Sequence, residues 1–75
     1  GIFDGDIVVV QEQSTVDDGE KAVAYLPDKD SVTLKRIYHE KDRIRLVPAN
    51  KDMEPFYETN VKIQGKVVGV LRREI

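Results

Sequence analysis

The chain has 75 residues and a mass of 8.5 kDa, about half the size of a typical domain, which leaves room for one small core. A content of 40% hydrophobic and 35% charged residues excludes both a membrane-spanning protein and a disordered one. The net charge of −2 leaves no broad cationic surface for phosphates, and the absence of cysteine excludes disulfides, thiolate zinc sites and cysteine nucleophiles. We therefore expect a soluble protein of a reducing compartment, the cytoplasm, with no membrane contact.

The start of the chain indicates a piece of a longer protein. Gly1 is not an initiator methionine, and the residues up to Ile7 run directly into an apolar stretch without the features of a signal peptide. A domain of this size buries only about 60% of its unfolded surface. We therefore expect exposed sheet edges or dimerisation.

Short β-branched runs alternate with breaks rich in Gly, Pro, Asp and Asn, which is the pattern of short strands joined by turns. No long stretch keeps a 3.6-residue period, so the chain is predicted to be mainly β, with a single helical turn possible at Lys51 to Glu54. The expected strands are Ile7 to Gln11, Lys21 to Leu26, Val32 to Tyr38, Ile44 to Pro48, Val61 to Gln64 and Lys66 to Arg72.

Most motifs that carry chemistry are missing from the sequence. It contains no phosphate-binding glycine loop and no H-E-x-x-H zinc motif, so we expect no cofactor. Asp4 and Asp6 flank Gly5 and could bind a hard cation, but the other oxygen ligands of a calcium loop do not follow, and a turn is the better interpretation. His39 lies alone in a polar stretch and is interpreted as a solvated turn residue. We expect no metal.

One strand places a hydroxyl and an amine side by side. Side chains alternate along a strand, so Thr33 and Lys35 share the face opposite to Val32 and Leu34. A lysine acts as a general base near neutral pH only if its pKa falls by about 3 units from about 10.4, which burial in apolar surroundings can supply. A threonine hydroxyl can accept a hydrogen bond from the amine and fix its direction. On spacing alone, an exposed pair is the more common outcome for Thr-x-Lys.

Four short blocks occur in order along the chain. They are G-I-x-D-G-D from Gly1, V-T-x-K-R from Val32, L-x-P-x-N from Leu46 and G-x-V-x-G-x-x-R from Gly65. Together these blocks resemble the C-terminal domain of LexA repressors, and the match runs essentially end to end. The resemblance implies an incomplete β-barrel-type fold of short, mostly antiparallel strands, like that of LexA and signal peptidases. Residues 1–75 would form the C-terminal part of an autopeptidase and dimerisation domain.

The resemblance also implies a serine–lysine autopeptidase. Lys35 matches the family's general base, and Thr33 matches the threonine that hydrogen-bonds its amine. The family's serine precedes the first block by a few residues, so it and the cleavage loop would lie before Gly1. Ser14 is interpreted as a turn residue, and Ser31 lies about 13 Å from Lys35 along an extended strand. Neither should replace the missing serine, and this chain alone should be inactive.

The partners expected from the resemblance are those of an SOS-response repressor in the bacterial cytoplasm. Such a protein forms a homodimer, binds operator DNA through an N-terminal domain absent from this chain, and cleaves itself on contact with RecA filaments during the response to DNA damage. The strand Lys66 to Arg72 is apolar at almost every position, so both of its faces should be covered, either by the dimer or within one subunit.

Two alternatives remain open. A phage repressor or a UmuD-like polymerase accessory protein shares the V-T-x-K-R segment and the self-cleavage chemistry. A non-catalytic β-barrel interaction module would instead carry Lys35 as an ordinary exposed cation. We expect Arg36 to form a structural salt bridge or to lie at a sheet-surface position. Four aromatic residues are expected to supply the bulk of the core: Tyr25, Tyr38, Phe56 and Tyr57.

Overall fold

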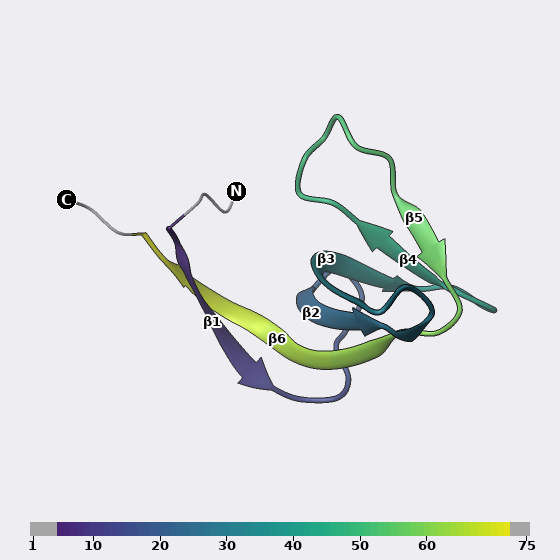
Figure 1. The fold of residues 1–75 in the computed structure, drawn as a ribbon, viewed down its shortest axis with the longest axis horizontal. Helices are drawn as coiled ribbons and strands as arrows, with labels where there is room; N and C mark the ends of the chain where they lie inside the picture. The colour runs from purple at the N-terminus through teal and green to yellow at the C-terminus, as the bar shows by residue number, and fades with distance from the viewer. Residues whose placement is uncertain (1–4, 73–75) are drawn as a thin grey trace.

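The structure, a computed structural model, describes residues 5–72, so Gly1 to Asp4, which begin the first sequence block and the Asp4-Gly5-Asp6 turn, lie outside it. The described part is mainly β, with six strands in one open antiparallel sheet and a 3-10 turn, η1 (Figure 1). No helix in this part is long and apolar enough to cross a membrane. The elements are β1 (Ile7–Glu12), β2 (Lys21–Leu26), η1 (Pro27–Lys29), β3 (Ser31–His39), β4 (Ile44–Val47), β5 (Phe56–Glu58) and β6 (Lys62–Leu71).

The strand order in the sheet is β1-β6-β2-β3-β4-β5. The first part of β6 pairs with β2, and its later part pairs with β1 from Gly65 to Leu71. Figure 1 shows β1 and the later part of β6 as a two-stranded arm that extends away from the other strands. The predicted mainly β fold is therefore confirmed, and the sheet is not closed.

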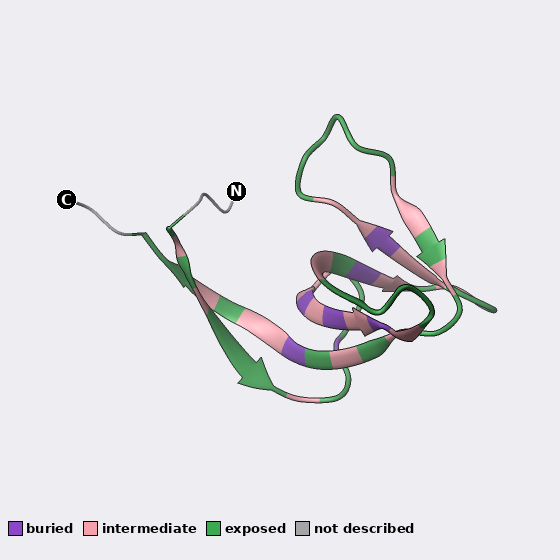
Figure 2. Ribbon diagram, in the orientation of Figure 1, coloured by how far each residue is buried: buried purple, intermediate pink, exposed green. Residues whose placement is uncertain are grey.

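The core lies on one face of β2, β3 and β4. Burial alternates strictly along β2, which is visible in Figure 2 as buried positions separated by intermediate ones. Ile37 of β3 and Leu46 of β4 are directly opposed partners and are the largest fully buried side chains. The buried residues of the described chain are Val16, Ala22, Ala24, Leu26, Ile37 and Leu46, with Ile44, Phe56, Val61 and Ile63 packed against them.

The prediction of two strands on either side of Gly65 is wrong, because β6 passes through this residue without a break. Gly65 pairs with Glu12 of β1 on one side and with Val23 of β2 on the other. A Cβ atom at Gly65 would lie 2.3 Å from a methyl carbon of Val10 and 2.8 Å from the carbonyl oxygen of Gln11. The glycine therefore marks the close approach of β1 and not the end of a strand.

The segment between β4 and β5 also differs from the prediction. The helical turn proposed at Lys51 to Glu54 is absent, and strand β5 was not predicted. The Asp52 amide donates to the Asn50 side-chain oxygen at 2.9 Å, and the Met53 amide donates to the Asn50 carbonyl at 3.1 Å. An asparagine that bonds the backbone two residues ahead stabilises a turn in place of a helix.

The expected aromatic core is correct only for Phe56, which packs against the buried cluster. Tyr57 is 44% exposed, and Tyr25 and Tyr38 are half-buried. The described residues do not cover both faces of the last strand, because Leu71 is 60% exposed. The apolar side chains of the arm that remain exposed are Ile7, Val9, Val10, Val68, Val70 and Leu71.

The close approach at Gly65 predicts a stability difference between two glycines of the same strand. Gly65→Ala should lower the free energy of unfolding by about 1–3 kcal/mol, because the new methyl group overlaps Val10 and the Gln11 backbone. Gly69→Ala is the matched control, since its Cβ would lie 3.9 Å from the nearest atom, on Val9. It should be neutral or stabilising by up to about 1 kcal/mol. Urea unfolding followed by circular dichroism measures the free energy of unfolding of both variants. Equal changes in the two variants would contradict the close approach of β1 at Gly65.

Candidate functional site

The amine of Lys35 is held by two neutral oxygen atoms. Its Nζ donates a hydrogen bond to Oγ1 of Thr33 at 2.6 Å and another to the carbonyl oxygen of Leu34 at 3.2 Å. All three residues are half-buried. Among residues 5–72, Lys35 takes part in none of the ion pairs of the structure. The pairing of Thr33 and Lys35 predicted from their spacing is thus present.

Register places this pair on the core face of the sheet. Thr33 lies directly opposite Ala24, and Lys35 lies directly opposite Ala22. Opposed residues of an antiparallel pair point to the same face, and both alanines are fully buried. The short alanine side chains provide an apolar surface beside the lysine stem. The predicted alternation along β3 is correct, and it directs the amine to the apolar side of the sheet.

A pocket of about 340 Å³ lies between β3 and the segment that follows β4. Its walls combine Lys35 and Leu34 with residues that sequence reasoning did not assign to the site. These residues are Val47, Pro48, Ala49, Asn50 and Met53. The L-x-P-x-N block contains four of these five residues, so the sequence motif indicated part of the site. Their position beside Lys35 depends on the turn that Asn50 forms.

The edge of β3 beside this pocket is open. The Ile37 amide donates to Glu20 at 3.1 Å, and the Gly19 amide donates to Ile37 at 2.8 Å, so odd-numbered residues of β3 direct their backbone groups toward β2. Even-numbered residues therefore face the β4 side. Pairing with β4 ends at Arg36, and no strand of the described chain continues along Val32 and Leu34. The sheet edge at these two residues can therefore accept an added strand.

Two further cations line the pocket, Lys21 and Arg36. Arg36 is exposed, as predicted, and its Nη1 donates to the Gly19 carbonyl at 2.6 Å. The neighbouring carboxylate, Glu20, contacts the amine of Lys66. This hydrogen bond lowers the pKa of Glu20 and raises the pKa of Lys66. Glu20 is therefore engaged by Lys66 and not by Lys35.

Neither serine of the chain reaches this pocket. Ser31 is the exposed first residue of β3, four positions before Lys35. Ser14 is also exposed and lines two other pockets, which do not include Lys35. The structure therefore does not bring a described serine to the lysine amine.

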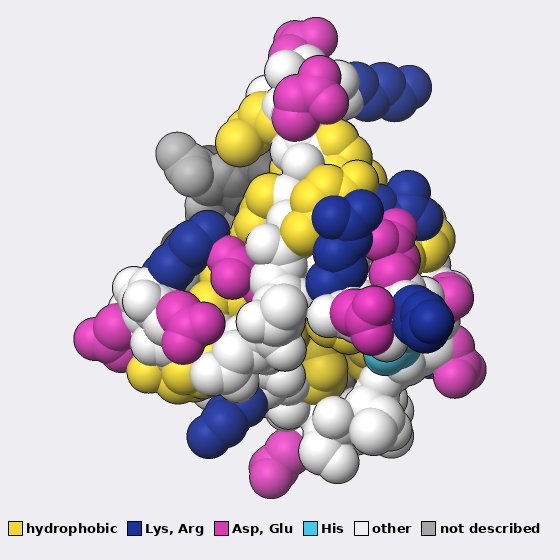
Figure 3. Space-filling model, turned by 90° about the vertical axis from the view of Figure 1, so that its right-hand side faces the viewer, with side chains coloured by type: hydrophobic (Ala, Val, Ile, Leu, Met, Phe, Trp, Pro, Cys, Tyr) yellow, Lys and Arg dark blue, Asp and Glu magenta, His cyan; other side chains and the backbone are white. Residues whose placement is uncertain are grey.

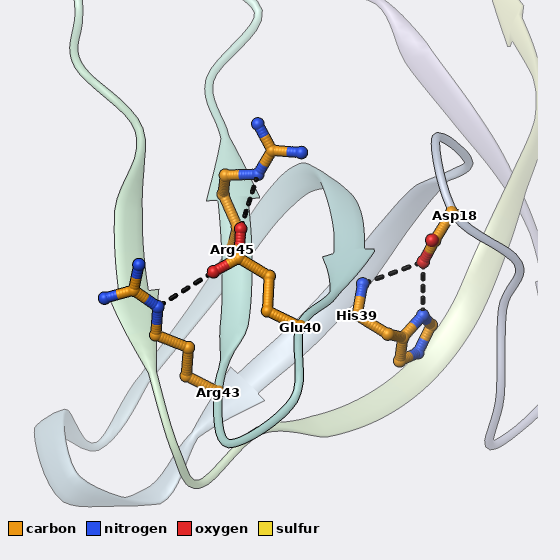
Figure 4. A network of polar contacts seen from close by, with 5 residues as sticks. All are labelled: Asp18, His39, Glu40, Arg43 and Arg45. Carbon is orange, nitrogen blue, oxygen red and sulfur yellow. Dashed lines mark hydrogen bonds and ion pairs between the residues drawn. The ribbon is translucent and has the colours of Figure 1, made fainter.

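His39 has a structural contact that the sequence did not predict. It is the last residue of β3 and not a turn residue, and both its amide and its ring nitrogen lie against Oδ1 of Asp18, at 2.7 and 2.6 Å (Figure 4). These contacts, the amide first, lower the pKa of the Asp18 carboxyl. The pair joins the loop before β2 to the end of β3, away from Lys35.

Comparison with known proteins gives a consistent result. The profile of the Peptidase S24-like family matches residues 1–68. The chain is 55% identical over 73 residues to a LexA repressor of Herpetosiphon aurantiacus, which covers 95% of this chain and 34% of that protein. It is 51% identical over 72 residues to the LexA repressor of Halalkalibacterium halodurans, and the match covers 96% of this chain and 34% of that protein. For the LexA repressor of Limosilactobacillus reuteri the identity is 51% over 75 residues, with 100% and 36% covered.

The chain thus spans about a third of the length of the curated relatives that it matches. The family profile covers far more than half of this chain, and it includes every strand up to the middle of β6. The chain belongs to the Peptidase S24-like family.

Proposed function

We propose that this chain is the lysine-bearing part of a serine–lysine autopeptidase domain in a LexA-type repressor. Lys35 acts as the general base and Thr33 orients its amine. The observation that carries the proposal is the pair of hydrogen bonds that fix the amine of Lys35, a residue that lines a mainly apolar pocket. A serine from the part of the protein that precedes residue 1 supplies the nucleophile.

The chemistry requires a neutral amine at Lys35. The amine removes the proton from the serine hydroxyl as the serine oxygen attacks the carbonyl carbon of a peptide bond in the same protein. The ammonium then gives this proton to the leaving nitrogen as the peptide bond breaks. Water hydrolyses the resulting ester in a second step. Thr33 Oγ1 and the Leu34 carbonyl hold the lysine nitrogen along one direction throughout.

The open edge of β3 is suited to hold the peptide that is cut. An extended segment can pair with the backbone of Val32 and Leu34, along which no strand of the described chain continues, as strands commonly add to exposed sheet edges. In this position it passes along the pocket, and one of its side chains can contact Val47, Pro48 and Met53. The Leu34 carbonyl, which accepts a bond from Lys35, lies on this same edge.

The arm formed by β1 and β6 supports a homodimer. Apolar side chains of both strands are exposed on it, including Ile7, Val9, Val70 and Leu71. Burial of this area between two subunits would supply the coverage that the described residues lack. We further propose that the whole protein acts in the bacterial cytoplasm, binds operator DNA through an N-terminal domain and responds to RecA filaments.

Self-cleavage of the full-length protein tests the base. The protein is incubated at pH 7 and at about pH 10, and the products are resolved by mass. Cleavage should be about tenfold faster or more at high pH, because a larger fraction of the lysine amine is then neutral. Lys35→Ala should reduce the rate at least about 100-fold at both pH values. Lys62→Ala, at an exposed position of β6, is the charge-matched control and should cleave normally. A folded wild-type protein that stays intact at both pH values would leave the non-catalytic interaction module as the better interpretation.

A second pair of variants tests the role of Thr33. Thr33→Val removes the oxygen that accepts the 2.6 Å hydrogen bond while keeping the volume of the side chain. The cleavage rate should fall about tenfold or more, whereas Thr33→Ser keeps the acceptor and should retain most of the rate. Amine acetylation read by mass spectrometry provides a second readout: Lys35 should label more slowly than the exposed Lys62, and Thr33→Val should reduce this difference. Equal rates in Thr33→Val and wild type would remove Thr33 from the proposal.

The dimer is tested by charge insertion on the arm. Leu71→Lys should shift the full-length protein from dimer to monomer in size-exclusion chromatography with light scattering, because it places a charge in the buried area. Val32→Lys is the matched control, since both side chains are 60% exposed but Val32 lies on β3, outside the arm. If both variants remain dimeric, the dimer interface lies outside the arm.

A further inference from the structure

The face of the sheet opposite to the core carries a row of arginine and tyrosine side chains. Tyr38 of β3, Arg45 of β4 and Tyr57 of β5 are directly opposed across the three strands. Their neighbours Ile37 and Leu46 are buried, so alternation places the row on the other face. The Arg45 guanidinium carbon lies 4.5 Å from the centre of the Tyr38 ring. Arg43, next to the start of β4, stacks on Tyr57 in the same way at 3.7 Å.

The Glu40 carboxylate forms an ion pair with the Nε atom of each arginine, and only the pair with Arg43 is also a hydrogen bond. Glu40 Oε1 accepts a hydrogen bond from Nε of Arg43 at 2.8 Å, and its Oε2 lies 3.3 Å from Nε of Arg45. Figure 4 shows the ends of both guanidinium groups pointing away from Glu40. Within residues 5–72 no hydrogen bond or ion pair engages the Nη atoms of either arginine. Stacking and the shared carboxylate thus orient two guanidinium ends, and both ends remain available.

Two oriented guanidinium ends are suited to carboxylates. Each planar end can donate two parallel hydrogen bonds to one carboxylate. The side chains of Arg43 and Arg45 are 51% and 37% exposed, so a partner can reach them. Tyrosine and arginine are also among the residues most enriched at the energetic centres of protein interfaces. The surface therefore has the composition of a protein-docking site.

The charge pattern favours an acidic protein segment over a nucleic acid. A nucleic acid requires several phosphate contacts along a continuous basic surface. Here the net charge of the chain is −2, and Glu40 and Asp42 lie next to the two arginines. Figure 3, which views the molecule from the right-hand side of Figure 1, shows acidic side chains interspersed among the basic ones without a continuous basic stripe. A phosphate backbone needs several cations in a row, which the acidic neighbours interrupt, whereas two carboxylates need only the two guanidinium ends.

We propose that Arg43 and Arg45, stacked on Tyr57 and Tyr38, form a docking site for neighbouring carboxylates of an acidic protein segment. The site lies on the face opposite to Lys35 and is independent of the proposed cleavage. It needs the flat shape of the guanidinium as well as its charge, because a lysine ammonium can neither donate in two parallel bonds nor be fixed by both the ring and Glu40.

A peptide-binding experiment tests the site. A fluorescein-labelled hexaglutamate peptide is titrated with the full-length protein at low ionic strength, and binding is measured by fluorescence anisotropy. Arg43→Gln with Arg45→Gln should weaken binding at least about tenfold, because two charged hydrogen-bonding groups are lost. Arg43→Lys with Arg45→Lys keeps the charge and should still weaken binding several-fold. Tyr57→Ala should also weaken it, because the charge stays but the Arg43 group loses its support. Circular dichroism confirms that each variant is folded.

The matched control is Lys51→Gln with Lys62→Gln, which removes two exposed cations elsewhere and should change affinity less than about twofold. Equal weakening by this control, full affinity in the arginine-to-lysine variant, or no binding of the peptide would each overturn the proposal. A thymidine oligonucleotide that binds more tightly than the peptide and loses affinity in the arginine-to-glutamine variant would overturn it in favour of nucleic acid. Self-cleavage of that variant should be unchanged, so failure of this proposal and failure of the proposed cleavage are separable.

Discussion

The alternation of side chains along β3 is the constraint on which the rest of the structure depends. Ile37 is fully buried against Leu46 and fixes which face of β3 points to the core. Thr33 and Lys35 precede it at the same spacing, so the same packing that forms the core directs the lysine amine to the apolar face. A shift of one residue in the β3 register would move Lys35 to the Arg and Tyr face and would bury Arg36 in its place. The core and the site are therefore specified together.

The end of β4 determines the shape of the site. Pairing with β3 stops at Val47, and the next residue is Pro48, which has no backbone amide to donate to a neighbouring strand. The chain therefore leaves the sheet at this point and turns at Asn50. Its departure exposes the edge of β3 at Leu34 and forms the opposite wall of the pocket. A longer β4 would fill the edge at which a peptide can be held.

Sequence reasoning predicted the features that local alternation and turn chemistry control. It placed β2 with its observed bounds and put Thr33 beside Lys35 on one face, because both conclusions need only a period of two. It failed where a distant segment decides the outcome. Gly65 resembled a strand break, but the approach of β1 explains the glycine. Tyr38 and Tyr57 resembled core residues. Their stacking with Arg45 and Arg43 could not be predicted, because it depends on the pairing of three strands.

The contacts of Lys35 also bear on how a lysine can serve as a base. A carboxylate within a few ångströms would strongly favour the charged ammonium, which cannot accept a proton. The structure gives Lys35 two neutral oxygen atoms instead, while the neighbouring Glu20 is engaged by Lys66. Arg36 and Lys21 line the same pocket, and none of its lining residues carries a carboxylate. Among the described residues the Glu20 carboxylate thus contacts the amine of Lys66, whereas the Lys35 amine contacts neutral oxygen atoms, which is the arrangement that the proposed base requires.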